Sequence, residues 1–171
     1  MVESMISLTT PFFIVQKHKA THLHYDFRLQ INAILKSWAL PKGPTLNPRK
    51  KRLAIPTEDH LLSYANFEGI IPSNQYGAGI VLMWDQGPYK NITLKNGKYI
   101  PIEEALKSGH AIIDLSGEKL KGAFILQRIT EKRWLFIKKK DEHSSQKDIL
   151  NEFPFSVISH KKIEDFEIPS L

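Results

Sequence analysis

Short apolar stretches separated by turn-forming residues run through most of the chain. Eight of these stretches have the length and pattern of β-strands, at residues 12–16, 22–31, 35–40, 53–57, 80–84, 110–116, 122–128 and 134–138. Proline and glycine mark turns between them, at 41–44, 77–79, 87–88, 116–117 and 121–122. The pattern therefore predicts a fold built mainly from short strands.

Helical signals are few. Residues 101–108 begin with Pro101, carry Glu103 and Glu104 in the first turn and end before Gly109, which predicts one short helix. Residues 148–151 are expected to form one further turn of helix. We expect a mainly β fold, a compact β-barrel of about eight strands with one or two short helices, because an open sheet of this size leaves edges to protect.

Length and composition favour a single domain over residues 1–171, with a short N-terminal arm at 1–11 and a polar C-terminal segment at 141–171. The chain has no cysteine, which excludes disulfides, Cys-ligated zinc, iron–sulfur clusters and thiol catalysis. No apolar run approaches the ~20 residues of a membrane span. Glu3 and the shortness of the first apolar stretch argue against a signal peptide. We therefore expect a cytoplasmic protein with no membrane partner.

The charge is strongly positive, at +6 with an isoelectric point near 9.4. Lysine and arginine gather at residues 49–52, 138–140 and 161–162. A domain this basic often binds a polyanion such as nucleic acid, although the same charge also occurs on plain solvated surfaces.

The segment at 22–29 alternates without a break between apolar and polar residues. One set contains Leu23, Tyr25, Phe27 and Leu29, and the other contains His22, His24, Asp26 and Arg28. Side chains two apart on a strand share a face, so the first set is predicted to pack into the core. The second face carries two imidazoles, a carboxylate and a guanidinium group, an unusual set for a strand face that is only exposed to solvent.

His24 and Asp26 can place a nitrogen and an oxygen ligand on one cation, and His18 is a third ligand six residues upstream, near a predicted turn. Two histidines and one carboxylate suit Mn²⁺, Fe²⁺ or Zn²⁺. The alternative is a polar face whose histidines bond to their neighbours. Arg28 can clamp a phosphate or form a salt bridge to Asp26 or Glu58.

Further candidates follow along the chain. His60, predicted to lie in a loop after a strand, can act as a general acid or donate to a phosphoryl oxygen, and Tyr64 can add a phenolic donor. Lys42 and Arg52 add positive charge. The glycine-bearing turn at 74–79 could cradle a phosphate or be a plain tight turn, and its Tyr76, or Phe67, could stack a base. Trp38 and Trp84 lie in apolar stretches and are expected in the core. His110, His143 and His160 are expected to be structural or surface residues.

A series of motifs in one order resembles the phosphoesterase domain of bacterial DNA ligase D. The motifs are FIVQKHKATHLHYDFRL at 13–29, LKSWALPKGP at 35–44, KRLAIPTEDH at 51–60, YANFEGIIP at 64–72, YGAG at 76–79, WDQG at 84–87 and FPFSVIS at 153–159. The similarity runs from about residue 12 to residue 162.

The resemblance implies a compact β-barrel with Mn²⁺-dependent 3′-end-healing activity. Its substrates would be DNA primer-template 3′ ends that carry ribonucleotides or a 3′-phosphate. A phosphodiesterase step would remove the terminal ribonucleoside, and a phosphomonoesterase step would remove the remaining phosphate. By position, His18, His24 and Asp26 match metal ligands, whereas Gln16, Arg28, His60 and Tyr64 match the phosphate site, with Arg52 and Lys42 as further basic residues. His22 falls where relatives often have another residue.

The chain also differs from the family's usual pattern. An arm with basic and acidic residues usually precedes the domain, whereas only residues 1–11 precede the match here, and Asn74 stands where a glycine is usual. We expect a standalone, nucleoid-associated version whose ligase and polymerase act in trans. Two alternatives remain open, a non-catalytic DNA-end-binding module and a non-haem Fe(II) oxygenase that uses His110 as its distal ligand.

Overall fold

The computed structural model describes residues 10–167 of the 171-residue chain, which include only the last two residues of the predicted N-terminal arm. The elements are β1 (Phe12–Lys19), β2 (Leu23–Ile31), β3 (Ile34–Leu40), β4 (Arg52–Leu61), η1 (Leu62–Asn66), β5 (Gly69–Ile71), β6 (Gly79–Asn91), β7 (Leu94–Lys95), β8 (Lys98–Tyr99), α2 (Ile102–Ser108), β9 (His110–Ser116), β10 (Lys121–Thr130), β11 (Arg133–Lys138), α3 (Ile149–Glu152) and η2 (Ile163–Phe166).

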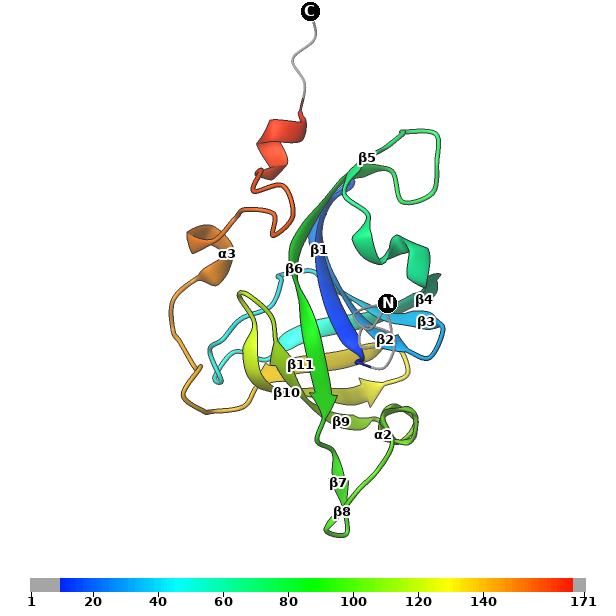
Figure 1. The fold of residues 1–171 in the computed structure, drawn as a ribbon, viewed down its shortest axis with the longest axis vertical. Helices are drawn as coiled ribbons and strands as arrows, with labels where there is room; N and C mark the ends of the chain where they lie inside the picture. The colour runs from blue at the N-terminus through cyan, green and yellow to red at the C-terminus, as the bar shows by residue number, and fades with distance from the viewer. Residues whose placement is uncertain (1–9, 168–171) are drawn as a thin grey trace, which may run out of the picture.

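Eight antiparallel strands close into a barrel (Figure 1). The order is β1-β2-β3-β4-β11-β10-β9-β6, and β1 completes the circle by pairing with β6. The short strand β5 pairs with the start of β6. Closure gives every barrel strand two neighbours, which removes the exposed edges of an open sheet. The predicted mainly β barrel of about eight strands is confirmed.

The apolar faces of the strands pack together in the core of the barrel. On β2, Tyr25, Phe27 and Leu29 are buried as the alternation predicts, but Leu23 at the start of the strand is 49% exposed. Trp38 and Trp84 are fully buried in the same core, as expected. Burial of each large apolar side chain contributes roughly 1.5–3 kcal/mol, so this interior dominates the stability of the barrel.

Strand β6 runs through residues 87–88, which the sequence predicts as a turn; that prediction is wrong. Pro88 lies where β6 passes from its partner β1 to its partner β9, the point at which a missing N–H disturbs the ladders least. Gly87 is needed for a different reason, because a methyl group there would overlap the carbonyl of Ser116. Gly87 and Pro88 therefore allow β6 to change partners and to pass close to the end of β9.

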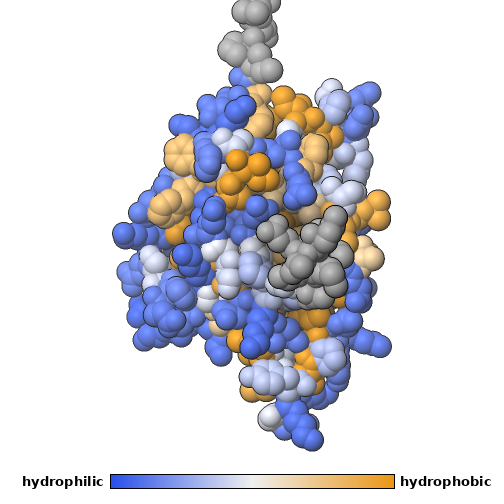
Figure 2. All heavy atoms as spheres, viewed as in Figure 1, coloured by the Kyte–Doolittle hydropathy of each residue, from blue (hydrophilic) through white to orange (hydrophobic). Residues whose placement is uncertain are grey.

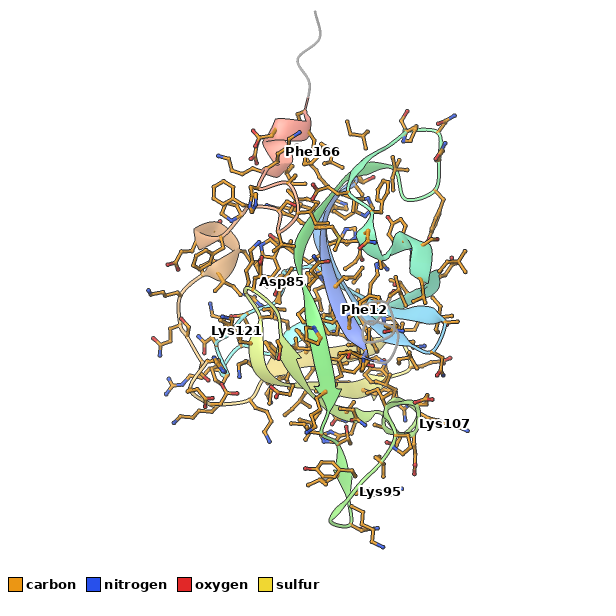
Figure 3. The ribbon with its side chains drawn as sticks, viewed as in Figure 1. Phe12, Asp85, Lys95, Lys107, Lys121 and Phe166 are labelled. Atoms are coloured by element: carbon orange, nitrogen blue, oxygen red, sulfur yellow. The ribbon has the colours of Figure 1, made fainter. Side chains whose placement is uncertain are left out.

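A small hairpin, β7–β8, projects from the barrel and was not predicted. Asn96 and Gly97 between its strands both have positive φ, 52° and 77°, as a two-residue hairpin turn requires. Lys95 marks its far end in Figure 3. The Asn-Gly pair was the sequence signal for this hairpin. The short elements β5, η1 and η2 were also not predicted.

Both predicted helices are present. Pro101 is the N-cap of α2, and Gly109 ends it in the left-handed region with φ 86°. Asp148 caps α3 by accepting from the backbone N–H groups of Leu150 and Asn151.

A buried carboxylate fixes the turn between β9 and β10. Asp85 of β6 accepts hydrogen bonds from the backbone N–H groups of residues 118–120, and it lies near the middle of the molecule in Figure 3. Burial raises the pKa of Asp85, and these hydrogen bonds partly offset the rise. The carboxylate therefore replaces the missing cross-strand partners of this turn.

On the face drawn in Figure 2, hydrophilic residues predominate and apolar side chains form separate patches between them. Within residues 10–167, no helix is long and apolar enough to cross a membrane.

Candidate metal and phosphate site

Six of the nine candidate residues lie on one face of β1, β2 and β4, the face that points away from the barrel core. His24, Asp26 and Arg28 alternate on β2 with the core residues described above. His18 is the penultimate residue of β1, next to the turn at residues 20–22 as the sequence suggested, and it lies directly opposite His24. Antiparallel pairing therefore brings together ligands that are six residues apart in the chain.

Three donor atoms converge at this position. His24 Nε2 lies 3.2 Å from Asp26 Oδ2, and His18 Nδ1 lies 3.7 Å from the same oxygen. His18, His24 and Asp26 each offer a ligand atom within 4.8 Å of the others, and within residues 10–167 they form the one group of this kind. The histidine rings meet edge to face, with centroids 4.8 Å apart.

Backbone carbonyls orient both imidazoles. His18 Nε2 donates to the carbonyl of Gly77 at 2.9 Å, and His24 Nδ1 donates to the carbonyl of His22 at 3.2 Å. Because a carbonyl only accepts, it is the other nitrogen of each ring that faces Asp26, and this nitrogen donates to the carboxylate when the ring is protonated and carries a lone pair when the ring is neutral. Lone pairs and a carboxylate aimed at one space repel one another unless a cation lies between them, so this donor set fits a divalent metal.

The groups of the cluster shift one another's pKa values. Burial alone would raise the pKa of Asp26, but hydrogen bonds from His18 and His24 and the charge of Arg28 hold it well below its usual range. The hydrogen bond to Asp26 raises the pKa of His24, against the opposing effect of burial. Asp26 is therefore an ionised carboxylate at neutral pH.

Arg28 is fixed by contacts along its whole guanidinium group. Its Nε donates to Gln16 Oε1 at 2.8 Å and its Nη1 to Ser37 Oγ at 2.8 Å, while Nη2 lies 3.4 Å from Asp26 Oδ2. Its Cζ lies 5.2 Å from the centre of the Tyr64 ring. The predicted salt bridge to Asp26 exists, and it shares its carboxylate with the two histidines.

His60 lies on β4, not in the predicted loop. Leu35 pairs with His60 whereas Ser37 pairs with Thr57, so β4 carries one extra residue in this stretch. Simple alternation would place Thr57 and His60 on opposite faces, and this bulge brings both to the site. The Tyr64 ring lies 5.0 Å from the His60 ring.

The protonation of His60 depends on two neighbours. Nδ1 lies 2.9 Å from the carbonyl of Glu58, to which it donates when it carries the hydrogen, and 3.2 Å from Arg28 Nη1, from which it accepts when it does not. Burial, and after it the charge of Arg28, lowers the pKa of His60. A neutral imidazole results at pH 7, able to donate through one nitrogen and accept through the other.

These groups line a pocket of about 370 Å³. Its lining consists of His18, His24, Asp26, Arg28, Ala39, Thr57, His60, Tyr64, Ile71, Tyr76 and Gly77. Six of the nine candidate site residues are among them. Ala39, Thr57 and Ile71 carried no signal of their own in the sequence.

Three candidates lie outside the lining. Gln16 is fully buried behind Arg28, and its Nε2 donates to the carbonyl of Phe67 at 3.1 Å. Arg52 starts β4 two residues before the core residue Ala54, so it shares the face of Ala54 and lies opposite the face that carries Thr57. Lys42 is exposed in the turn after β3.

His22 and His110 are not among the metal donors. His22 is exposed and contributes its carbonyl. His110 on β9 bonds Gln127 Oε1 at 2.6 Å, away from the His18–His24–Asp26 group, so the oxygenase arrangement that needs His110 is not formed. The predicted turn at 77–79 follows β5, and the carbonyl of Gly77, not an N–H, faces the cluster.

Comparison with known proteins agrees with the geometry. The model of the DNA ligase D 3′-phosphoesterase domain family matches residues 16–128. The chain is 44% identical over 158 residues to the multifunctional non-homologous end joining protein LigD of Pseudomonas aeruginosa. It is 41% identical over 130 residues to the multifunctional non-homologous end joining DNA repair protein LigD of Mycobacterium tuberculosis.

These matches cover 88% and 76% of this chain but only 18% and 16% of the two relatives, so the chain spans under a fifth of their length. The matched region contains every donor and phosphate-site candidate named above. The chain therefore belongs to the DNA ligase D 3′-phosphoesterase domain family.

Proposed function

We propose that this chain is a Mn²⁺-dependent phosphoesterase that heals DNA 3′ ends for repair by end joining. Its substrates are primer-template ends that carry ribonucleotides or a 3′-phosphate, and its product is a 3′-OH. The observation that carries this proposal is the convergence of three metal-type donors within 4.8 Å, with a fixed guanidinium group 3.4 Å from the shared carboxylate.

His18 Nδ1, His24 Nε2 and one oxygen of Asp26 would hold the metal. When bound, Mn²⁺ supplies a Lewis acid that polarises a phosphoryl oxygen and orients the attacking group. The hydrogen bonds from both imidazoles to carbonyls keep their ligand nitrogens aimed at the metal position.

Arg28 and His60 stabilise charge on the phosphate oxygens. The four contacts from Arg28 to Gln16, Ser37, His60 and Asp26 use at most four of its five N–H groups, so at least one remains for a phosphate. Because these contacts hold the group before substrate arrives, little reorganisation is needed during the reaction. Tyr64 positions the phosphate beside them, and Gln16 acts through Arg28.

The basic segments hold the duplex next to the end. Strand pairing of Arg52 with Phe136 places the run at 49–51 beside the run at 138–140, and Arg49 and Lys140 line one pocket of about 300 Å³. Lys138 is buried against Asp141, whereas the exposed cations of the two runs, together with Lys42, fit a phosphate backbone, whose binding weakens with salt. A ligase and a polymerase then act on the healed end, and the protein works at the nucleoid.

A gel assay on a 5′-labelled primer-template tests the proposal. One substrate ends in a ribonucleotide and a second ends in a 3′-phosphate, each with and without Mn²⁺. We expect stepwise conversion to a 3′-OH product only with metal, lost in His24→Ala and Asp26→Ala variants that keep their circular dichroism spectra. Binding without product in any divalent metal would replace the proposal with a non-catalytic end-binding module. Oxygen uptake with Fe²⁺ would replace it with an oxygenase.

A further inference from the structure

An exposed aromatic residue stands at the mouth of the metal and phosphate pocket. Tyr76 lies on the loop between β5 and β6, lines the pocket and is 83% exposed. Ile71, the last residue of β5, lines the same side, and its Cδ1 lies 3.8 Å from the point where a side chain at Gly77 would begin. None of the metal or phosphate chemistry described above uses these two side chains.

The loop is tied directly to the metal-binding cluster. The carbonyl of Gly77, the residue after Tyr76, accepts from His18 Nε2 at 2.9 Å. Gly77 has φ 76°, which only a residue without a Cβ adopts readily, and Gly79 lets the loop return against the carbonyl of Lys19. The bond from His18 therefore fixes the position of the Tyr76 backbone relative to the metal donors.

The pocket consequently has two chemically different sides. Arg28 and His60 supply charge and N–H donors for a phosphate, whereas Ile71 and Tyr76 supply an aliphatic group and an aromatic ring. An aromatic ring stacks on any nucleobase, a contact worth ~1–3 kcal/mol per base.

We propose that Tyr76 and Ile71 form a nucleobase subsite for the terminal nucleoside, the group that leaves in the diesterase step. This inference rests on the proposed function. The nucleotides that remain on the strand stay stacked and paired in the duplex, so the terminal base is the one free to reach a protein ring. In this step water adds to phosphorus and the bond from phosphorus to O5′ of the terminal nucleoside breaks. The strand keeps a 3′-phosphate, and the nucleoside leaves with the proton on its O5′.

The test compares three substrates with the same duplex and scissile phosphate. The first ends in a ribonucleoside, the second in an abasic riboside and the third in a 3′-phosphate. For the Tyr76→Ala variant we expect kcat/KM on the ribonucleoside end to fall about tenfold, mainly through KM. Its ratio of diesterase to monoesterase activity should fall by a similar factor. For the wild type, kcat/KM should be about tenfold lower on the abasic end than on the ribonucleoside end. For Tyr76→Ala, kcat/KM should be nearly the same on these two ends.

Two further variants separate stacking from structure. Tyr76→Phe keeps the ring and should retain the preference for a base, and Tyr99→Ala is a control because Tyr99 is 71% exposed on β8 and does not line the pocket. Equal loss of both activities in Tyr76→Ala, or an unchanged preference for the base, would overturn the subsite while leaving the proposed function intact. A wild type that releases neither a nucleoside nor phosphate would overturn the proposed function and the subsite with it.

Discussion

Gln16 provides the sharpest test of how the barrel positions the phosphate-binding group. Its side chain is fully buried and makes two kinds of contact. Oε1 accepts from Arg28 Nε at 2.8 Å, and Nε2 donates to the carbonyls of Phe67 at 3.1 Å and Tyr64 at 3.4 Å. One amide therefore links the guanidinium group to the backbone of η1 and of the residue that follows it.

The Gln16→Met variant keeps the volume of the side chain and removes both contacts. Losing a hydrogen bond to a charged group costs about 1.5–3 kcal/mol, and a buried carbonyl left without its donor adds ~1 kcal/mol or more. We expect the free energy of unfolding to fall by about 3 kcal/mol. Gln16→Glu keeps an acceptor for Arg28 but loses the amide donor, so it separates the two contributions.

Urea denaturation and calorimetric Mn²⁺ titration measure the outcome. Because the hydrogen bonds of the Gln16 side chain go to Arg28 and to carbonyls of residues 64 and 67, and not to the three metal donors, Mn²⁺ affinity should stay near the wild-type value while phosphate release falls at least tenfold, since Arg28 is no longer held in place. Gln30→Met is the matched control, because Gln30 makes one long bond of 3.3 Å to the carbonyl of Asn32. A Gln16→Met protein with wild-type stability, or one that has lost Mn²⁺ binding along with activity, would refute this reasoning.

Three further outcomes follow from the structure. Since the pKa of Asp26 is lowered from 3.8, its ionisation stabilises the metal-free fold in full above that pH, so the difference in melting temperature between wild type and Asp26→Asn should shrink only as pH falls from about 4 towards 2. Gly87→Ala should cost about 3 kcal/mol or more in urea denaturation, because its methyl meets a backbone carbonyl at the end of β9. Gly97→Ala, with open space and φ 77°, should cost about 1 kcal/mol. Lys140→Gln should weaken DNA binding and reduce its salt slope by about one, whereas Lys95→Gln on the hairpin should change neither.

The parts of the site that depend on local alternation were predictable from the sequence. Strand geometry alone sends His24, Asp26 and Arg28 to one face of β2 and Phe27 to the other, whatever the rest of the chain does. The barrel was predictable for a related reason, because short apolar stretches with turns between them need closure to satisfy their edges.

The parts of the site that depend on pairing between distant segments were not predictable from the sequence. His60 reaches the site only because β4 has an extra residue opposite β3, and nothing in the sequence of β4 announces that bulge. Gln16 turns out to be a buried support because η1, about fifty residues later, folds over it. Tyr76 reaches the pocket because the carbonyl of the next residue, Gly77, accepts a hydrogen bond from His18, which lies 59 positions earlier in the chain. Register and loop placement are tertiary properties, so motif and pattern alone do not fix them.

Asp26 joins the two halves of the site, and this limits which substitutions can separate them. One carboxylate oxygen, Oδ2, lies within 3.7 Å of His18 and His24 on the metal side and 3.4 Å from Arg28 on the phosphate side. Removing that charge weakens the metal site and frees the guanidinium group at once, so loss of activity in an Asp26 variant cannot distinguish metal binding from phosphate binding. Substitutions at the outer contacts can, because His24 touches only the metal side and Gln16 touches only the phosphate side. The Gln16→Met variant should therefore lose phosphate release with its Mn²⁺ affinity unchanged, whereas His24→Ala should lose Mn²⁺ binding while Arg28 keeps its hydrogen bond to Gln16.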